Sequence, residues 1–158
     1  MIRLATKDDL EALTEVRDKS IRRLAPAAYS QCQIDGWLST TGSIFSKFGN
    51  PKNIIFVEEF EGNVIAFAQL DADTATVERM YVAPDFARQG IGARLIAQLE
   101  ATAANLGIRT LRLDATLNGL PFYEASGYST EQRYDDILPG GVKFPYVKMA
   151  KTLRAHFD

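Results

Sequence analysis

Two glycines, Gly90 and Gly92, mark the part of the sequence best suited to chemistry, within the stretch Pro84–Ala93. An apolar segment typical of a strand precedes this stretch, and a segment of helical periodicity follows it. The first turn of a helix carries unpaired backbone N–H groups and the positive end of the helix dipole. Glycines there let an anion approach the backbone, so the loop predicts a phosphate site, with Arg88 and Arg94 available for charged contacts. The alternative is that both glycines only shape a turn.

Two common phosphate-binding motifs do not fit this loop. A dinucleotide fingerprint needs a third glycine three residues after Gly92, and Leu95 stands there. A Walker-type loop needs Gly-Lys followed by Ser or Thr, and Pro84–Ala93 has no such run. The loop therefore predicts a phosphate-bearing ligand of another kind.

Two segments resemble the signatures of a known family. Glu78–Pro84 followed by Arg88–Leu95 resembles the acetyl-CoA signature of the GNAT superfamily of N-acetyltransferases. Asn118–Tyr128, with its Phe-Tyr and Gly-Tyr pairs, is similar to the second signature of that family. Both occur in the family's order and at its usual separation. One departure is Ala87, which stands where the family has Gln or Arg, so Arg88 or backbone N–H groups would take that role.

The resemblance implies that acetyl-CoA is the co-substrate and implies where it binds. Main-chain groups of Met80, Tyr81 and Val82 would pair with the pantetheine arm. Asn118 would contact the same arm, and Tyr123 would lie near the thioester sulfur. The pyrophosphate would be held by the loop and first helical turn, at Arg88, Gln89, Gly90, Ile91, Gly92 and Ala93.

The transfer itself needs a base and a proton donor. A free alkylamine has a pKa of about 10.4, and only its neutral form attacks a thioester. Glu78 is the candidate base, because strand alternation places it on the same face as Met80. The alternative is a solvent-facing glutamate or an ion pair with Arg79 or Arg112. Tyr123, which falls on a signature position, is the candidate acid for the leaving thiolate; the alternative is a core tyrosine.

The acceptor pocket is expected to involve Tyr29 and Trp37, because the resemblance places the N-terminal helical pair along one wall of that pocket. A packing role is the alternative, especially for Trp37, which shares a helical face with Ile34 and Leu38. The acceptor would be a small-molecule or peptide amine. The chain has one cysteine, Cys32, and one histidine, His156, so no metal site is expected. Cys32 is expected to be a small core residue.

These groups must be positioned by the elements around them. The strands are expected at 2–4, 54–60, 64–70, 76–82, 111–114, about 128–134 and 142–153. The helices are expected from a capping box at Thr6 and Asp9 to Arg23, from a second box at Ser30 and Gln33, at Gly90–Leu106, and at Pro121–Ser126. This order predicts a mixed sheet with helices on both faces. With the resemblance, the expected fold is a single GNAT-type α/β (α+β) domain over residues 1–158, with a mostly antiparallel sheet of about six to seven strands.

Composition limits the partners and the compartment. The net charge is -2 and the pI about 5.5, so binding to nucleic acid or to an anionic membrane is not expected. The sequence has no signal-peptide pattern and no apolar run of about 20 residues, so a cytoplasmic location is expected. A homodimer is possible on general grounds. The main alternative to an enzyme is a domain that binds or senses acyl-CoA without catalysis.

Overall fold

The structure is a computed structural model that describes residues 1–40 and 46–154. In this part of the chain a sheet of seven strands runs in the order β1-β2-β3-β4-β5-β7-β6. All neighbouring strands are antiparallel except β4 and β5, which are parallel. The predicted mixed, mostly antiparallel sheet is therefore confirmed. The strands are β1 (Ile2–Leu4), β2 (Asn53–Phe60), β3 (Asn63–Asp71), β4 (Thr76–Val82), β5 (Thr110–Thr116), β6 (Ser129–Leu138) and β7 (Val142–Thr152).

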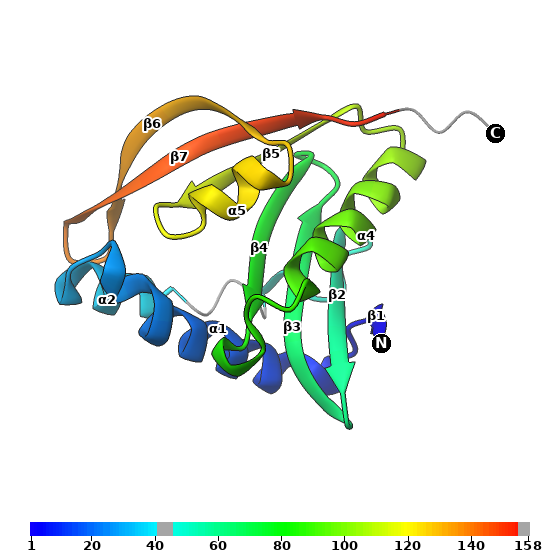
Figure 1. The fold of residues 1–158 in the computed structure, drawn as a ribbon, viewed down its shortest axis with the longest axis horizontal. Helices are drawn as coiled ribbons and strands as arrows, with labels where there is room; N and C mark the ends of the chain where they lie inside the picture. The colour runs from blue at the N-terminus through cyan, green and yellow to red at the C-terminus, as the bar shows by residue number, and fades with distance from the viewer. Residues whose placement is uncertain (41–45, 155–158) are drawn as a thin grey trace.

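Helices cover both faces of the sheet, as predicted. In Figure 1, α4 lies in front of β2 and β3, and α1 passes behind these strands. The helices are α1 (Leu10–Leu24), α2 (Gln31–Leu38), α4 (Ile91–Asn105) and α5 (Leu120–Ala125). Short 3-10 turns at Lys7–Asp9, Ala25–Ala27 and Pro84–Phe86 lead into or connect these elements.

Both predicted capping boxes are present. The backbone N–H of Thr6 donates to Oδ2 of Asp9 at 2.7 Å, and Arg3 forms an ion pair with the same carboxylate at 2.8 Å. The backbone N–H of Gln33 donates to Oγ of Ser30 at 3.2 Å, and Ser30 N–H donates back to Oε1 of Gln33 at 2.8 Å. Each box satisfies donors that a helix N-terminus leaves free, so these short motifs determine where the α1 and α2 regions begin.

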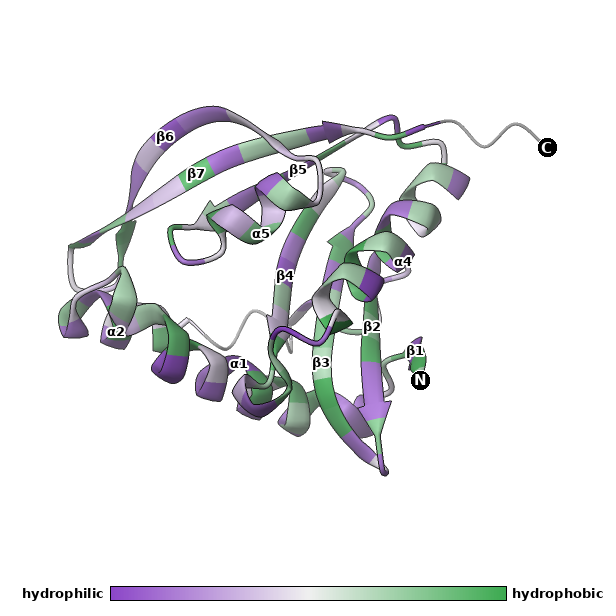
Figure 2. Cartoon of the chain, viewed as in Figure 1, coloured by the Kyte–Doolittle hydropathy of each residue, from purple (hydrophilic) through white to green (hydrophobic). Residues whose placement is uncertain are grey.

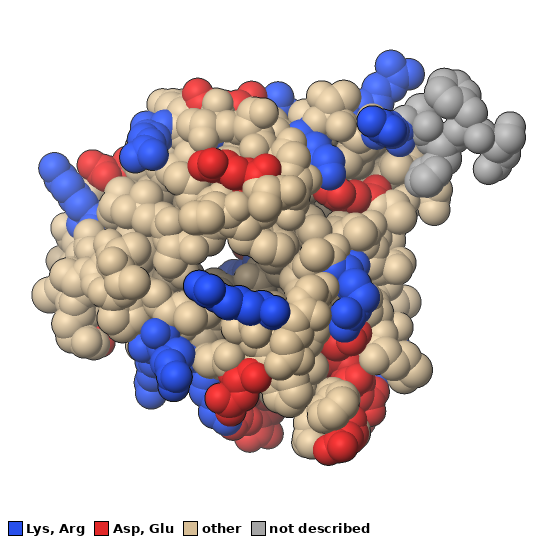
Figure 3. All heavy atoms as spheres, in the orientation of Figure 1, with Lys and Arg blue, Asp and Glu red and all other residues tan. Residues whose placement is uncertain are grey.

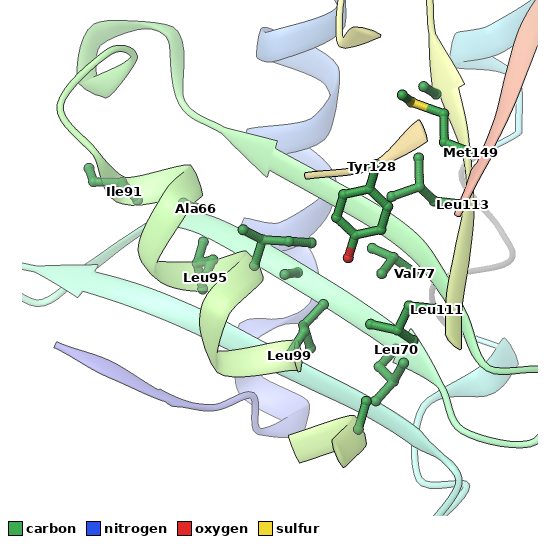
Figure 4. Packing of buried hydrophobic residues seen from close by; sticks show 14 of the residues in the cluster. Ala66, Leu70, Val77, Ile91, Leu95, Leu99, Leu111, Leu113, Tyr128 and Met149 are labelled. Atoms are coloured by element: carbon green, nitrogen blue, oxygen red, sulfur yellow. The ribbon is translucent and has the colours of Figure 1, made fainter. Parts of the chain in front are cut away.

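The core is built on the apolar stripe of α4. Ile91, Leu95 and Leu99 are buried and point from this helix toward the sheet (Figure 4). They pack on side chains from β3, β4, β5 and β7, which include Ala66, Leu70, Val77, Leu111, Leu113 and Met149. Full burial of one such aliphatic side chain contributes about 1.5–3 kcal/mol. The stripe therefore fixes the start of α4 relative to β4.

The central strands differ from the C-terminal hairpin in character. β3 is buried along almost its whole length and is largely apolar, whereas β6 carries polar residues and is mostly exposed (Figure 2). β6 also continues to Leu138 instead of ending near Tyr134 as predicted. Its backbone pairing with β7 extends to the turn, from Ser129↔Ala150 to Leu138↔Val142. Apolar content was therefore a poor guide to the end of this edge strand.

Candidate active site

Strands β4 and β5 separate soon after they meet. They pair only at Thr76↔Arg112 and Val77↔Leu113. Beyond this point β4 stays in register with β3, whereas β5 continues beside β7 as far as Thr116. Within residues 1–40 and 46–154, the edge of β4 that faces β5 therefore has no strand partner from Glu78 to Val82. Such an edge offers main-chain N–H and C=O groups to an extended ligand, as the resemblance implies for Met80, Tyr81 and Val82.

A β-bulge lies where the two strands separate. Leu70 of β3 pairs with Val77, and Gln69 pairs with Arg79, so Glu78 is an additional residue in β4. The prediction that Glu78 and Met80 point to the same face assumes that side chains alternate regularly along the strand. The bulge interrupts this alternation between the two residues. Met80 packs against the core under α4, whereas the carboxylate of Glu78 contacts Lys47 and Arg79. Bulges re-aim side chains in this way next to functional sites.

Two adjoining cavities occupy the space between the diverging strands. One has a volume of about 60 Å³ and the other about 340 Å³, and both are bordered by Val77, Glu78, Arg79 and Asp114. The smaller cavity is also lined by Trp37, Met80, Tyr81, Thr116 and Tyr123. The larger is also lined by Lys47 and Thr76. In Figure 3 the surface is hollowed near the centre of the view, between the positions of β4 and α5, and a basic side chain crosses the opening. The structure thus brings Glu78, Tyr123 and Trp37 to one cleft.

Only one of the two carboxylate oxygens of Glu78 accepts a hydrogen bond from the described residues. The ammonium of Lys47 donates to Oε1, and Nη1 of Arg79 lies 3.6 Å from Oε2. Oε2 accepts no hydrogen bond from the described residues, although the side chain is only 14% exposed. The alternative role of Glu78 as an ion-pair partner of Arg79 is therefore present, whereas Arg112 pairs with Glu131 instead. A carboxylate oxygen that borders a cavity can accept a proton from a bound amine.

Tyr123 lies across the smaller cavity, on α5. Its ring makes edge contacts with Phe122 and Tyr128, at centroid distances of 5.2 and 5.9 Å. Burial raises the pKa of the Tyr123 hydroxyl, so the phenol stays protonated at neutral pH. A higher pKa also makes the phenol a weaker acid. The group is therefore better suited to donate a hydrogen bond to a leaving thiolate than to give up its proton fully.

The start of α4 is open to an anion. The first intrahelical hydrogen bond runs from the N–H of Arg94 to the carbonyl of Gly90 at 3.1 Å. In the described chain, no amide from Arg88 to Ala93 donates a hydrogen bond to another residue. Gly90 has a φ of 81° and Arg88 a φ of 61°, which is uncommon for a residue other than glycine. A backbone held this way often marks a functional site.

The polar side chains near this loop differ in availability. Arg88, Gln89 and Asn118 are exposed, and Asn118 lies in the connection from β5 to α5. Arg94 instead forms an ion pair with Glu58, with Nη2 2.9 Å from Oε1. Arg88 is therefore better placed than Arg94 to supply positive charge to a phosphate at this site.

Tyr29 and Trp37 lie on the wall formed by the α1–α2 region. The hydroxyl of Tyr29 donates to the carbonyl of Pro145 at 2.8 Å and accepts from the N–H of Leu117 at 2.9 Å. Burial raises the pKa of Tyr29 to about 12. This hydroxyl is engaged by backbone groups, so Tyr29 supports the wall from behind. Trp37 borders the smaller cavity, and its carbonyl accepts a 2.7 Å hydrogen bond from the buried Arg17.

Sequence reasoning did not single out several residues of the cleft, among them the charged Asp114 and Lys47. Asp114 lies between the buried Leu113 and Ala115 in β5. Because side chains of a strand alternate between its two faces, the sequence could have placed Asp114 on the face opposite the core. Lys47 gave no such signal, because its contact with Glu78 joins segments far apart in the sequence. Both carry charge at the border of the larger cavity.

Other sequence expectations concern residues outside the cleft. Cys32 is exposed, so its predicted place in the core is wrong. His156 lies outside the described residues. Among the described residues there is no cluster of three or more potential metal ligands of the His, Cys, Asp or Glu type. None of the helices in the same part of the chain has the length and apolar character needed to cross a membrane.

Comparisons with known proteins agree with this architecture. The family model for the acetyltransferase (GNAT) domain matches residues 51–130, which include the splayed strand, the glycine loop and α5. Spermidine N(1)-acetyltransferase of Thermoplasma acidophilum is 27% identical over 142 residues, covering 82% of this chain and 88% of that protein.

Solved structures share the whole fold. A GCN5-related N-acetyltransferase from Rhodopseudomonas palustris superposes with a TM-score of 0.89 at 25% identity, covering 97% of this chain and 95% of the other. The PaiA N-acetyltransferase of Thermoplasma acidophilum in complex with coenzyme A gives a TM-score of 0.78 at 22% identity, with coverage of 96% and 98%. The chain therefore belongs to the GNAT family and is an N-acetyltransferase that uses acetyl-CoA.

Proposed function

We propose that the protein acetylates a small-molecule primary amine by direct attack of the amine on the thioester, with Glu78 as base and Tyr123 as hydrogen-bond donor to the leaving thiolate. One observation carries this proposal. Glu78 and Tyr123 border the same cavity of about 60 Å³, at the point where β4 separates from β5. A base and a hydrogen-bond donor that border one cavity can act in the same reaction, the base on the attacking amine and the donor on the leaving thiolate.

The cofactor would bind along the open edge of β4. The pantetheine amides would pair with main-chain groups of Met80, Tyr81 and Val82, and Asn118 would contact the arm from the β5–α5 connection. The pyrophosphate would accept hydrogen bonds from the backbone N–H groups of the glycine loop and of the first turn of α4. The positive end of the helix dipole would add to this attraction. The N–H groups belong to Arg88, Gln89, Gly90, Ile91, Gly92 and Ala93.

The chemistry requires a neutral amine beside the thioester. Glu78 would remove one proton from the bound ammonium group, directly or through water. The amine would then attack the carbonyl carbon, and a main-chain N–H of the open β4 edge would stabilise the oxyanion. As the C–S bond breaks, the second amine proton would pass to the departing thiolate, to which the hydroxyl of Tyr123 would donate a hydrogen bond.

The acceptor would enter from the larger cavity. Glu78 and Asp114 place two carboxylates at its border, beside the cationic side chains of Lys47 and Arg79, and a cationic amine would pair with one of these carboxylates. The relative from Thermoplasma acidophilum is named for spermidine, an amine of this kind. Trp37 would contribute an aromatic surface, and Tyr29 would hold the wall in place from behind.

We also propose a cytoplasmic location and a homodimeric assembly. The single cysteine rules out an intramolecular disulfide and is compatible with a reducing compartment. Dimers are the commonest assemblies of soluble proteins. Sedimentation of the purified chain would test the assembly, and a monomer at all concentrations would contradict it.

An acceptor panel tests the proposed function. Release of the CoA thiol is measured with acetyl-CoA against polyamines, monoamines, amino acids and short peptides. The proposal predicts saturable release with cationic small-molecule amines and formation of the acetylated product. Release only with peptides would contradict the proposed substrate class. Binding of acetyl-CoA without transfer to any acceptor would favour the sensing domain instead.

A further inference from the structure

Lys47 places a primary ammonium group directly on the candidate base. Its Nζ donates to Oε1 of Glu78 and lies 3.8 Å from Oδ2 of Asp71. Lys47 also borders the larger cavity, which shares Glu78 with the smaller one. An amine that Glu78 is to deprotonate must lie against this same carboxylate. Lys47 thus occupies the position that the proposed acceptor needs.

The contact is unlike that of a buried structural ion pair. The side chain of Lys47 is 42% exposed, so its ammonium group stays in contact with solvent. Glu78 itself is 14% exposed, and its Oε2 is buried and accepts no hydrogen bond from the described residues. The ammonium of Lys47 can therefore exchange between Glu78 and solvent at the border of the larger cavity.

We propose that Lys47 is a self-acetylation site of this enzyme. The inference rests on the proposed function, because it uses the same cleft and the same base. Glu78 takes one proton from the Lys47 ammonium, and the neutral amine attacks the thioester carbonyl of bound acetyl-CoA. A C–N bond forms and the C–S bond breaks. The second amine proton ends on the CoA thiolate, and Glu78 returns its proton to solvent. The products are acetylated Lys47 and free CoA.

The modification would change the acceptor site. An acetylated lysine has no positive charge, so it no longer forms an ion pair with Glu78. The carboxylate then becomes available to an external ammonium group. In the unmodified enzyme Lys47 competes with the acceptor, and added acceptor should in turn protect Lys47 from acetylation.

The test uses the full chain and acetyl-CoA without any acceptor, followed by peptide mass spectrometry. Lys47 should gain one acetyl group at a first-order rate that does not depend on protein concentration. The exposed Lys52, five residues along, serves as the internal reference for uncatalysed acetylation. We expect Lys47 to react about 100-fold faster than Lys52, because a held amine reacts at a high effective concentration. Glu78→Gln should slow the reaction at Lys47 and leave that at Lys52 unchanged.

Lys47→Arg is the matched control, because arginine keeps the charge beside Glu78 and cannot be acetylated under these conditions. This variant should lose the modification and should transfer acetyl to an external amine with a raised KM for the amine, because the arginine still competes for Glu78. Equal rates at Lys47 and Lys52, or the same rate at Lys47 in the heat-unfolded chain, would overturn the inference. Transfer to an external amine without modification of Lys47 would overturn it and leave the proposed function standing. Loss of both reactions in the native chain would overturn both.

Discussion

Gly92 of α4 lies against the ring of Phe122 of α5. A Cβ atom at Gly92 would be 3.2 Å from Cε2 of Phe122 and 3.8 Å from Cε of Met80. The glycine thus has a packing role besides any contact with phosphate. It also couples the start of α4, where the pyrophosphate is proposed to bind, to the helix that carries Tyr123.

Gly92→Ala is expected to weaken acetyl-CoA binding and lower turnover together, because Phe122 must move and Tyr123 is the next residue. Overpacking of this kind costs roughly 1–3 kcal/mol of stability. Gly90→Ala is the comparison, because its Cβ would meet only Nη1 of Arg94 at 3.9 Å. Gly90 has a φ of 81°, so that variant should lose about 1–2 kcal/mol through backbone strain. Calorimetric titration of both variants with acetyl-CoA tests this, and wild-type affinity and turnover in Gly92→Ala would contradict it.

Tyr123→Phe should lower kcat roughly 100-fold or more and leave the affinity for acetyl-CoA nearly unchanged, because only the donor to the thiolate is removed. Tyr128→Phe is a matched control. The hydroxyl of Tyr128 donates to Oε2 of Glu100 at 3.1 Å and does not border the cleft, so its loss should reduce stability and spare turnover. Equal kcat values for Tyr123→Phe and the wild type would remove Tyr123 from the mechanism.

Glu78→Gln should reduce kcat/KM about 100-fold at neutral pH. The defect should shrink as the pH approaches about 10.4, because a growing fraction of the alkylamine is then already neutral. Glu131→Gln, which changes an exposed glutamate paired with Arg112, should behave like the wild type. Initial rates across this pH range measure the effect. A defect of constant size at all pH values would show that Glu78 does not act as the base.

Tyr29→Phe should destabilise the protein by about 1–3 kcal/mol at neutral pH, because Leu117 N–H and the carbonyl of Pro145 both lose their partner. Burial raises the pKa of Tyr29 from 10.0 to about 12. The neutral hydroxyl therefore stabilises the fold fully below pH 10, and that contribution is lost between pH 10 and 12. The stability difference between wild type and variant should narrow over this range. Urea unfolding at several pH values tests it, and a constant difference would contradict the assignment.

Local sequence signals predicted most of the fold. The boxes at Thr6 and Ser30 predicted where the first two helical regions begin, because these motifs satisfy backbone groups locally. The end of β6 was missed, because its side chains are exposed and its length depends on pairing with β7. The Glu78 bulge was missed for a similar reason, since register with β3 is a tertiary property.

The candidate site was predicted unevenly. The loop at Gly90 and the signature at Tyr123 are each continuous in sequence, so the order of residues along the chain is enough to recognise them. The partners of Glu78 could not be recognised in this way, because Lys47 reaches it from a segment far away along the chain. Hydrogen bonding of the Tyr29 hydroxyl to Pro145 likewise depends on how α1 and α2 pack on β7.

The most direct test of direct transfer in this cleft is a two-substrate initial-rate study with Lys47→Arg, which avoids any contribution from self-acetylation. Acetyl-CoA and the best amine of the panel are varied together, and thiol release is recorded. Direct attack requires both substrates to be bound at once, so the double-reciprocal lines should intersect. Parallel lines, with release of CoA before the amine binds, would indicate a covalent acetyl-enzyme and contradict the mechanism.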